Sequence, residues 1–538
     1  MTAKEATAAI LSLPEYLVEG ASHWPDRPWC TAPDGAATRA EMYADALACA
    51  AGLRARGVLP GDRVVIVLPN GLAFLRAWFG SMLAGAIAVA VNPSAAKSEL
   101  PAVVAGTAPA IVVAPDGTEV PPGVPTVSPA EFAGSPQEPV ASTPDTHAAY
   151  IQSSGSTGRP KFIIQTHGMY TMAGEGFPYW LGLGEDDVLL TSLPLSHLNA
   201  QAYSTLGSWI CGARLVLLPR FSASTFWETA RDTGATVVNM IGAMLEMLMA
   251  QAPTPAEREH RIRLCYSGPA PEAERHVAIE KRFGFRLVIG YAQSESPYGL
   301  ISPIDEPTVY GSSGRPRQHP RLGRINEARV VDPVSGHEVP DGEVGELQLR
   351  NPAITPGYAG MPEESAALRC DGWLRTGDLV RRDGGGSFTF AGRIKEMIRR
   401  RGENLSPAEV EAVLDAHPAV SSSAVIGVPS PMSEEDIKAF VRPVEGRTVT
   451  AQELGEWCAR RLPPYKVPRY IEFVDSWPLT NTNKIAKTRL PKDRTETEVD
   501  LVATTGRAQS LSGIRVRGQP TALCPGSGPR PDPKNTMD

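Results

Sequence analysis

Short apolar runs alternate with longer stretches of mixed polarity through the first half of the chain. The stretch 38–57 carries apolar residues at helical spacing, with a capping box of Thr38 and Glu41 at its start and Gly57 at its end, so we predict a helix there. The next apolar run, 62–70, predicts a buried strand. Similar runs lie at 86–93, 110–114, 188–195, 213–219, 236–242 and 286–292. Apolar strands that alternate with helices are typical of an α/β fold with largely parallel sheets.

The sequence pattern changes from about residue 305, where glycine and proline turns separate short predicted strands. A helix is predicted at 407–417, with Ser406 and Glu409 as a second capping box. We therefore expect a large N-terminal domain of layered sheets and helices, and a smaller α+β domain at the C-terminal end. The expected division is 1–392 for the large domain, 393–396 for a hinge, 397–492 for the small domain and 493–538 for a tail. The tail is rich in Gly, Pro, Ser and Arg without periodicity, which predicts disorder.

Composition narrows the class of protein. The 538 residues carry a formal net charge of −7 and are 42% hydrophobic, so a large core is available and a nucleic-acid partner is not expected. The seven cysteines are scattered and never spaced as C-x-x-C, which favours a reduced, cytoplasmic protein without a zinc site. The N-terminus does not resemble a signal peptide. No run approaches about 18 apolar residues, so no membrane span is expected.

The first candidate site is the loop "SSGSTGRPK" at 153–161. Its glycines, hydroxyls and terminal lysine are suited to phosphate, yet Pro160 and Phe162 break the G-x-x-x-x-G-K-[ST] pattern of the common phosphate loop. The apolar stretches on both sides predict that it joins two strands. An anion would then be held by loop amides, hydroxyls and Lys161. The alternative is a mobile polar turn. The loop residues proposed to bind are Ser153, Ser154, Gly155, Ser156, Thr157, Gly158 and Lys161.

Further motifs follow along the chain. "YAQSES" (291–296) ends a predicted strand, where α/β sheets usually place ligands. "WLRTGDL" offers Asp378, "GRIKEMI" offers Arg393, and "LTNTNKIAK" offers Lys484. The alternative for Asp378 and Arg393 is a surface salt bridge or turn cap, and for Lys484 a solvated lysine.

Taken together and in this order, these motifs resemble the signatures of the adenylate-forming superfamily, which contains acyl-CoA synthetases, luciferases and nonribosomal peptide adenylation domains. The resemblance covers roughly 12–492, and "MIRRRGENLSP" and "EEDIKAFV" look closest to the carnitine/crotonobetaine and medium-chain acyl-CoA ligases. It implies that ATP and Mg²⁺ activate a small-molecule carboxylic acid to an acyl-adenylate with release of pyrophosphate. The acyl group then passes to the thiol of coenzyme A, since no carrier domain follows in the chain.

Two alternatives remain open. One is a stand-alone adenylating enzyme that passes the acyl group to a carrier protein or an amine. The other is a degenerate nucleotide-binding protein, which is disfavoured because the charged residues of the motifs are all present. These residues are Lys161, Glu295, Asp378, Arg393 and Lys484.

The resemblance also implies roles for single residues. The 153–161 loop would hold the β- and γ-phosphates, Glu295 would bind Mg²⁺, and Lys484 would bridge the substrate carboxylate and the α-phosphate. Asp378, with Arg393 beside it, would hold the ribose hydroxyls. Adenine would lie between Tyr291 and a second wall, and Ser294 would contact the α-phosphate. The residues around adenine are Gly268, Pro269, Ala270, Tyr291 and Ala292.

The acyl side of the site is implied in the same way. His197 in "PLSHLNA" would be a gate beside the carboxylate, with a core histidine as the alternative, and Asn239 and Met240 would line the acyl pocket. The small domain is expected to be mobile, with Lys395 as the pivot. The sequence departs from the family at several positions, none of which removes a charged group. These are Phe162, Ala292, Asn351 and Asn483, where glycine is usual, and Ser294, where threonine is usual.

Overall fold

The computed structural model describes residues 10–132, 137–153, 160–400, 403–430, 435–479 and 485–502. The chain divides into two compact units, the first comprising Met1–Met397 with Leu479–Ala486 and the second Ile398–Pro478 with Lys487–Asp538. Lys395 lies in the short helix η5 (Ile394–Glu396), just before the change of unit. Its role as a pivot stays a prediction.

Two large sheets form the framework of the first unit. In the nine-stranded sheet, with the order β15-β14-β13-β12-β11-β9-β10-β1-β2, neighbouring strands from β13 to β1 run parallel. Its strands are β1 (Pro28–Ala32), β2 (Gly35–Thr38), β9 (Val188–Thr191), β10 (Arg214–Leu217), β11 (Val237–Asn239), β12 (Leu264–Ser267), β13 (Arg286–Gln293), β14 (Ser296–Ile301) and β15 (Arg315–Pro316). The predicted α/β class with largely parallel sheets is confirmed.

The six-stranded sheet has the order β6-β5-β3-β4-β7-β8, and only its last pair is antiparallel. Its central strands are buried, which explains why they are uninterrupted apolar runs in the sequence. The strands are β3 (Arg63–Ile66), β4 (Ile87–Ala90), β5 (Ile111–Val113), β6 (Thr126–Val127), β7 (His147–Ser153) and β8 (Lys161–Thr166).

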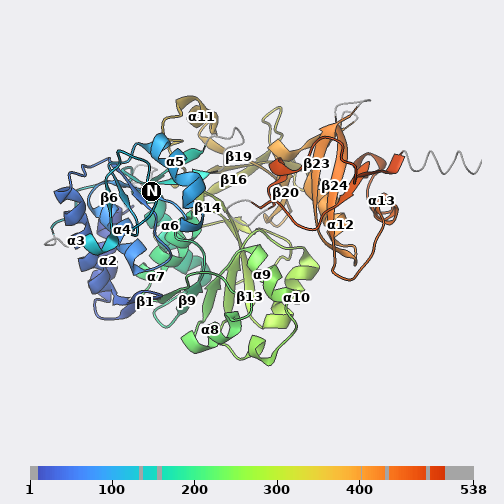
Figure 1. The fold of residues 1–538 in the computed structure, drawn as a ribbon. Helices are drawn as coiled ribbons and strands as arrows, with labels where there is room; N and C mark the ends of the chain where they lie inside the picture. The colour runs from blue at the N-terminus through green and yellow to red at the C-terminus, as the bar shows by residue number, and fades with distance from the viewer. Residues whose placement is uncertain are drawn as a thin grey trace, which may run out of the picture. The chain divides into compact units, whose positions relative to one another are not determined.

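Helices cover these sheets. The predicted first helix is α3 (Arg39–Ala55), and its capping box forms as expected, with Thr38 N donating to Glu41 Oε2 over 2.8 Å. Helices α4 (Leu72–Leu83) and α6 (His167–Leu181) are buried along most of their length. In Figure 1, α9 and α10 lie beside β13 of the nine-stranded sheet. The remaining helices of this unit include α2 (Leu13–His23), α5 (Ala96–Thr107), α7 (Leu206–Ile210), α8 (Phe226–Thr233), α9 (Gly242–Met249), α10 (Ala273–Phe283) and α11 (Pro362–Ala367).

A third, antiparallel sheet of the first unit comes from the turn-rich part of the sequence. Its members β19 and β20 pair so that Asp378 lies opposite Arg393. The strands are β16 (Glu327–Val331), β17 (Val344–Arg350), β18 (Arg369–Cys370), β19 (Trp373–Arg382) and β20 (Phe388–Arg393).

The second unit is α+β, as predicted. Figure 1 shows β23 and β24 side by side with α12 next to them. Apolar side chains of both helices and of the sheet share one core, in which Val410, Leu454 and Ile471 are buried. The elements are β21 (Ile398–Arg400), β22 (Glu403–Leu405), α12 (Pro407–Asp415), β23 (Val420–Pro429), β24 (Glu435–Pro443), α13 (Ala451–Ala459), β25 (Tyr470–Phe473) and β26 (Val499–Asp500).

Two expectations for this unit need correction. The predicted capping box at α12 does not form: the Ser406 hydroxyl has no partner among the described residues, the Glu409 N–H donates to Ser406 O over 3.2 Å, and the Glu409 carboxylate is paired with Lys466 Nζ. The tail expected from residue 493 is also wrong for residues 493–502, since β26 pairs antiparallel with β25. The Lys438 side chain is 1% exposed, and its ammonium lies 2.8 Å from a Glu498 carboxylate oxygen. A buried cation needs such partners, so these residues belong to the fold. Residues 503–538 lie outside the described ranges.

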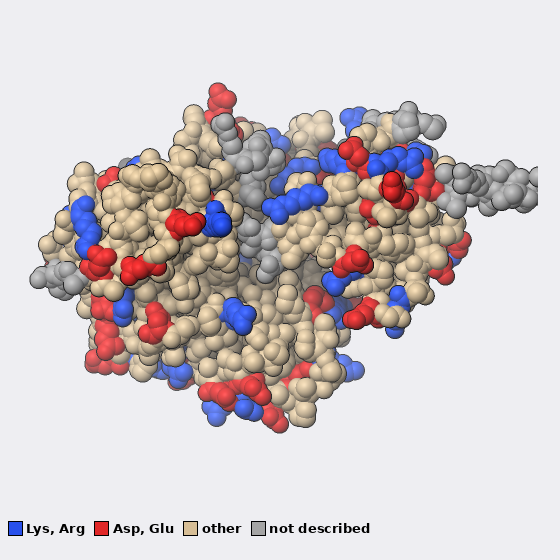
Figure 2. Space-filling model, in the orientation of Figure 1, with Lys and Arg blue, Asp and Glu red and all other residues tan. Residues whose placement is uncertain are grey.

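Surface charge is mixed. Acidic and basic side chains are interspersed over the face drawn in Figure 2, in keeping with the modest formal net charge of −7. None of the helices within the described ranges is long and apolar enough to cross a membrane.

Candidate active site

The candidate phosphate loop joins the antiparallel strands β7 and β8, with Ser153 directly opposite Lys161. This confirms the prediction that the loop connects two strands rather than a strand and a helix. Lys161 is therefore fixed at the first position of β8. The predicted binding residues between them lie outside the described residues. These are Ser154, Gly155, Ser156, Thr157 and Gly158.

The segment 355–359 adds to the outer edge of β8. Ile164 N donates to Gly357 O over 3.0 Å, Ala359 N donates to Phe162 O over 2.8 Å, and Ile163 is bridged to Tyr358. Side chains alternate along a strand, so Lys161 and Tyr358 share one face. The Lys161 ammonium lies 4.8 Å from the centre of the Tyr358 ring.

Tyr358 also contacts the predicted magnesium ligand. Its hydroxyl donates to Glu295 Oε1 over 3.0 Å. Burial, and next the negative charge of Glu295, raise the pKa of Tyr358, so the phenol stays protonated and keeps its donor. The backbone of Glu295 is tied to the same segment, because Thr355 N donates to Glu295 O over 2.9 Å.

The chemistry of Glu295 fits Mg²⁺. Magnesium in nucleotide sites is usually held by one or two carboxylates together with substrate phosphates, and Glu295 supplies one half-buried carboxylate. Within the described ranges, no three or more His, Cys, Asp or Glu side chains gather as a metal site. Ser294, next to it, is fixed through its carbonyl, which accepts from Gln165 Nε2 over 2.7 Å.

A second constellation surrounds Asp378. Its carboxylate accepts from Tyr291 Oη over 2.8 Å and from Gln293 Nε2 over 2.7 Å, and Arg393 Nε lies 3.0 Å from its other oxygen. Asp378 is 2% exposed, so the alternative of a surface salt bridge is wrong. Gly377, at φ +69°, makes the turn in front of it, a conformation that favours glycine.

Tyr291 is held by this carboxylate. Burial, followed by the charge of Asp378, raises the pKa of Tyr291 well above its ordinary value. The strand that carries Tyr291 lies close to Gly268, which belongs to the second predicted wall of the adenine site. A Cβ on Gly268 would come within 2.5 Å of the Gly290 carbonyl oxygen. Next to Gly268, Pro269 is exposed and Ala270 half-buried, and Ala292 is exposed beside Tyr291.

The predicted acyl pocket lies at the ends of neighbouring strands. Asn239 ends β11 opposite Thr191 of β9 and Tyr266 of β12. Its Nδ2 donates to Asn199 Oδ1 over 2.7 Å and to Ser204 Oγ over 2.8 Å. Both partners belong to the π-helix η3 (Asn199–Thr205), an element frequent at functional sites.

The other two predicted pocket residues differ in exposure. Met240 is buried, whereas His197 is half-buried in the loop before η3, where its backbone N–H donates to Pro194 O over 3.0 Å. The core histidine considered as an alternative is therefore not what the structure has. Lys484 lies outside the described residues.

Comparison with known proteins identifies the family. The family of AMP-binding enzymes matches residues 17–359, and the C-terminal domain of AMP-binding enzymes matches residues 409–484.

The chain belongs to the AMP-binding enzyme family.

Two curated relatives are similar over most of their length. The crotonobetaine/carnitine–CoA ligase of Salmonella typhi is 31% identical, covering 81% of this chain and 89% of the relative. The sulfoacetate–CoA ligase of Cupriavidus necator is 30% identical, and the match covers 91% of this chain and 99% of the relative. Among solved structures, ATP-bound MatB from Rhodopseudomonas palustris has a TM-score of 0.81 at 25% identity, covering 89% of this chain and 98% of that one. The o-succinylbenzoate CoA synthetase of Bacillus subtilis, in complex with its acyl-adenylate, has a TM-score of 0.81 at 26% identity. The match covers 91% of this chain and 100% of that one.

This AMP-binding enzyme is thus an AMP-forming acid–thiol ligase of the acyl-CoA synthetase type. It uses ATP, Mg²⁺ and coenzyme A, and its substrate is a small-molecule carboxylic acid. The predicted resemblance to the adenylate-forming superfamily, close to the carnitine ligases, is confirmed.

Sequence reasoning missed four residues of the candidate site. They bond to predicted residues through contacts between distant segments, and only Gln293 lay inside a quoted motif. The missed residues are Gln165, Gln293, Thr355 and Tyr358.

Two departures from the family pattern have structural explanations. Phe162 is buried in an apolar cluster, and its ring occupies the space that a Cβ at Gly106 would enter, 2.5 Å away. Asn351 cross-links its surroundings, with Nδ2 donating to Asn326 Oδ1 over 3.0 Å and Oδ1 accepting from Ala353 N over 2.9 Å.

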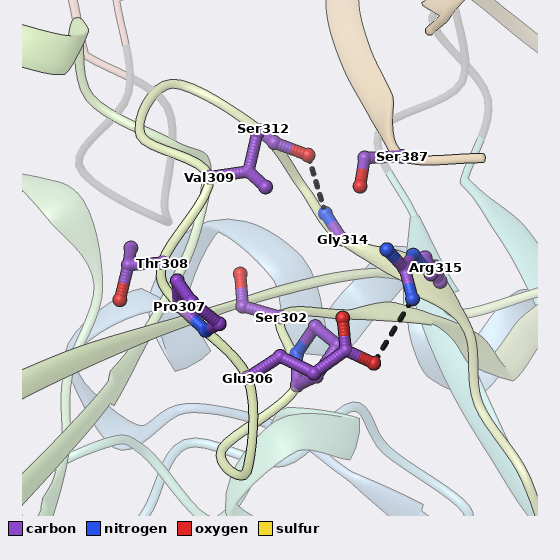
Figure 3. Close-up of a pocket in the computed structure, with 10 residues that line it drawn as sticks. Ser302, Glu306, Pro307, Thr308, Val309, Ser312, Gly314, Arg315 and Ser387 are labelled. Atoms are coloured by element: carbon purple, nitrogen blue, oxygen red, sulfur yellow. Dashed lines mark hydrogen bonds and ion pairs between the residues drawn. The ribbon is translucent and has the colours of Figure 1, made fainter. Parts of the chain in front are cut away.

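Two hollows elsewhere in the first unit are separate from this site. In the cavity of Figure 3, Arg315 pairs with Glu306 over 3.0 Å and Ser312 Oγ accepts from Gly314 N over 2.9 Å. Its volume, about 10 Å³, is room for one water at most. A groove of about 500 Å³ lies along α2, next to Tyr43 and residues 138–142. Neither contains a residue of the predicted site.

Proposed function

We propose that this ligase activates a small, hydrophilic carboxylic acid. A carboxylate oxygen attacks the α-phosphorus of ATP, the bond to the β-phosphate oxygen breaks, and pyrophosphate leaves. The sulfur of coenzyme A then attacks the carbonyl carbon of the acyl-adenylate, the acyl–oxygen bond breaks, AMP leaves, and the thiol proton passes to solvent. Neither step needs a nucleophilic side chain, so positioning and charge stabilisation are the tasks of the protein.

The observation that carries the proposal is the buried Asp378 carboxylate and its three donors. Tyr291, Gln293 and Arg393 reach it from β13 and β20. Each carboxylate oxygen has further acceptor capacity, which suits two neighbouring ribose hydroxyls. We assign the ribose to Asp378 and Arg393, adenine to the space between Tyr291 and residues 268–270, and the phosphates to the 153–161 loop and Ser294. Lys484 is assigned to the reacting carboxylate.

We assign Mg²⁺ to Glu295, and His197 to the entrance of the acyl pocket. When bound, Mg²⁺ neutralises charge that builds up on the phosphates. The carboxylate of Glu295 would offer Mg²⁺ one oxygen, while its other oxygen accepts the bond from Tyr358.

The class of acid follows from Asn239. This residue is 1% exposed, and its Oδ1 has no hydrogen-bond partner among the described residues. A buried acceptor without a partner costs about 1–3 kcal/mol, which a donor group on the substrate would offset. A Cβ at the nearby Gly242 would meet nothing closer than 3.9 Å, so there is room beside β11. The acids that name the two relatives, carnitine or crotonobetaine and sulfoacetate, are also hydrophilic.

Coenzyme A accepts the acyl group, so the proposed reaction requires no carrier-protein partner. The described cysteines are all free, which fits a reducing compartment, and we propose the cytoplasm.

A panel of matched acids tests the proposal. Pairs such as butyrate and 3-hydroxybutyrate, together with hexanoate and sulfoacetate, are assayed for carboxylate-dependent pyrophosphate release and for AMP release with coenzyme A. We expect kcat/KM to favour the hydroxylated member at least tenfold. Asn239→Leu should abolish that preference, whereas Asn70→Leu should not, because both ends of the Asn70 amide are bonded to backbone. Highest activity with hexanoate would overturn the acid class. Adenylation without thioester formation would overturn coenzyme A as acceptor.

A further inference from the structure

We propose that Tyr358 is a positioning residue for adenylation. Its hydroxyl orients the Glu295 carboxylate and its ring holds the Lys161 ammonium, so one side chain places both charged groups that the metal–triphosphate must meet. The inference rests on the proposed roles of Glu295 and Lys161 and goes beyond them, because it assigns a function to a residue outside the sequence motifs.

The backbone of Tyr358 is fixed on both sides. Its neighbours Gly357 and Ala359 are bonded to β8, and its own N–H donates to Ser365 Oγ over 2.8 Å. Thr355 Oγ1 donates to Ile164 O over 2.6 Å and closes the preceding turn. A side chain attached to such a rigid segment is pre-organised, which is what a positioning role requires.

The hydroxyl occupies one oxygen of Glu295 and leaves the other for a different partner. The bond to Oε1 is 3.0 Å long, and no described residue donates a hydrogen bond to Oε2. The Glu295 carbonyl is held by Thr355, from the same segment as Tyr358. Backbone and carboxylate are thus both oriented from residues 355–358.

The ring gives Lys161 a partner that does not compete with phosphate. Among the described residues no carboxylate forms an ion pair with Lys161, and its ammonium faces the Tyr358 ring at 4.8 Å. A carboxylate partner would have to be displaced by the triphosphate. A cation–π contact is weaker than a charge-assisted hydrogen bond to phosphate, so the ring can guide the ammonium and still release it.

Two substitutions separate the two contacts. Tyr358→Phe removes the hydroxyl and keeps the ring, and Tyr358→Leu removes both. Tyr310→Phe is the matched control, since Tyr310 is an exposed tyrosine whose hydroxyl also donates to a carboxylate, Glu280 Oε2, over 3.3 Å. Melting temperatures establish that each variant is folded.

The main readout is binding rather than turnover. Mn²⁺ is titrated by electron paramagnetic resonance into the full-length protein with a non-hydrolysable ATP analogue, and the Kd of the analogue is measured by calorimetry at saturating Mg²⁺. We expect Tyr358→Phe to weaken Mn²⁺ binding about tenfold and to leave the analogue Kd within twofold. We expect Tyr358→Leu to weaken both about tenfold. Tyr310→Phe should change neither.

A double-mutant cycle ties the effect to Glu295. In a Glu295→Gln background, Tyr358→Phe should cause no further loss of Mn²⁺ affinity. The positioning role is overturned if Tyr358→Phe binds Mn²⁺ like the parent, or if its loss adds fully to that of Glu295→Gln. Parent protein that forms no acyl-adenylate from any acid would overturn the proposed function instead, so the two failures are distinguishable.

Discussion

Asp378 and Arg393 face each other across the neighbouring strands β19 and β20, with Nε and Oδ1 3.0 Å apart. The carboxylate is buried, whereas 41% of the arginine side chain is exposed. The Asp378 carboxylate therefore lies in the interior, and the Arg393 side chain covers it on the solvent side. Tyr291 and Gln293 approach the same carboxylate from β13, so this acid links the nine-stranded sheet to the antiparallel sheet.

Asp378→Asn tests that link. The substitution replaces charge-assisted hydrogen bonds by neutral ones and turns a carboxylate oxygen into a donor that faces other donors. We expect the first unit to lose about 3 kcal/mol of stability and the KM for ATP to rise at least tenfold. Thermal unfolding and pyrophosphate release measure the two effects.

The matched control for Asp378 is Glu327→Gln on the same sheet. Glu327 pairs with Arg350 across β16 and β17, but both side chains are about half exposed. Its loss should cost about 0.5 kcal/mol and leave the KM for ATP unchanged. Equal destabilisation by the two substitutions would contradict the claim that the buried Asp378 carboxylate links the two sheets.

Phe162 and Gly106 should be strongly coupled. Phe162→Ala should cost about 3–5 kcal/mol through the cavity it leaves. Gly106→Ala should also destabilise the parent, because the new Cβ meets the Phe162 ring at 2.5 Å. In the Phe162→Ala background the same change should stabilise by up to about 1 kcal/mol, since alanine favours helix more than glycine does. Denaturant unfolding of the four proteins measures the cycle, and additive effects would contradict it.

His167 should lower the free energy of unfolding at low pH. It is fully buried, and burial lowers its pKa from 6.5 to about 4. The unfolded chain therefore binds the proton first. The contribution of the neutral His167 to the free energy of unfolding is complete above pH 6.5 and is lost as the pH falls towards 4. Between pH 7 and 5 the loss is about 2 kcal/mol.

The variant His167→Asn isolates this contribution. The asparagine oxygen can accept from Leu13 N in place of Nδ1, which now accepts over 3.1 Å, but it does not titrate. The melting temperature of the variant should fall less between pH 7 and 5 than that of the parent. Parallel curves would show that His167 is not responsible.

Lys484→Ala should separate the two half-reactions. Lys484 ends "TNTNK", and the resemblance to the family implies that it is the adenylation lysine, where a cation would stabilise charge on the reacting oxygens. We expect adenylation to fall by orders of magnitude, while thioester formation from supplied acyl-adenylate stays largely intact. Equal losses in both half-reactions, measured separately, would refute the assignment.

Lys395→Pro tests the pivot. Lys395 precedes the change from the first compact unit to the second. Proline fixes φ near −65° and removes an N–H, so a rotation there would be blocked. We expect single-turnover pyrophosphate release to continue and thioester formation to stop. Thioester formation at the parent rate would exclude Lys395 as the pivot.

The sequence alone determined the α/β class, the parallel strands and most candidate residues. Buried strands such as β4 and β5 need apolar side chains on both faces, so they show as unbroken runs without reference to any other segment. The motifs around Lys161, Glu295 and Asp378 are likewise short and local. The hairpin at 153–161 followed from the apolar stretches on its two sides.

Only the tertiary structure decided which distant residues meet. Nothing local to "TPGYAG" indicates that it pairs with the edge of β8, or that Tyr358 reaches both Lys161 and Glu295. The same holds for residues 498–500, which the sequence placed in the tail: Val499 and Asp500 pair with β25, and Glu498 supplies one of the two carboxylates that neutralise the buried Lys438. Side-chain periodicity is a property of one segment. The pairing of segments depends on which packing of the whole chain buries its apolar surface and satisfies its buried charges.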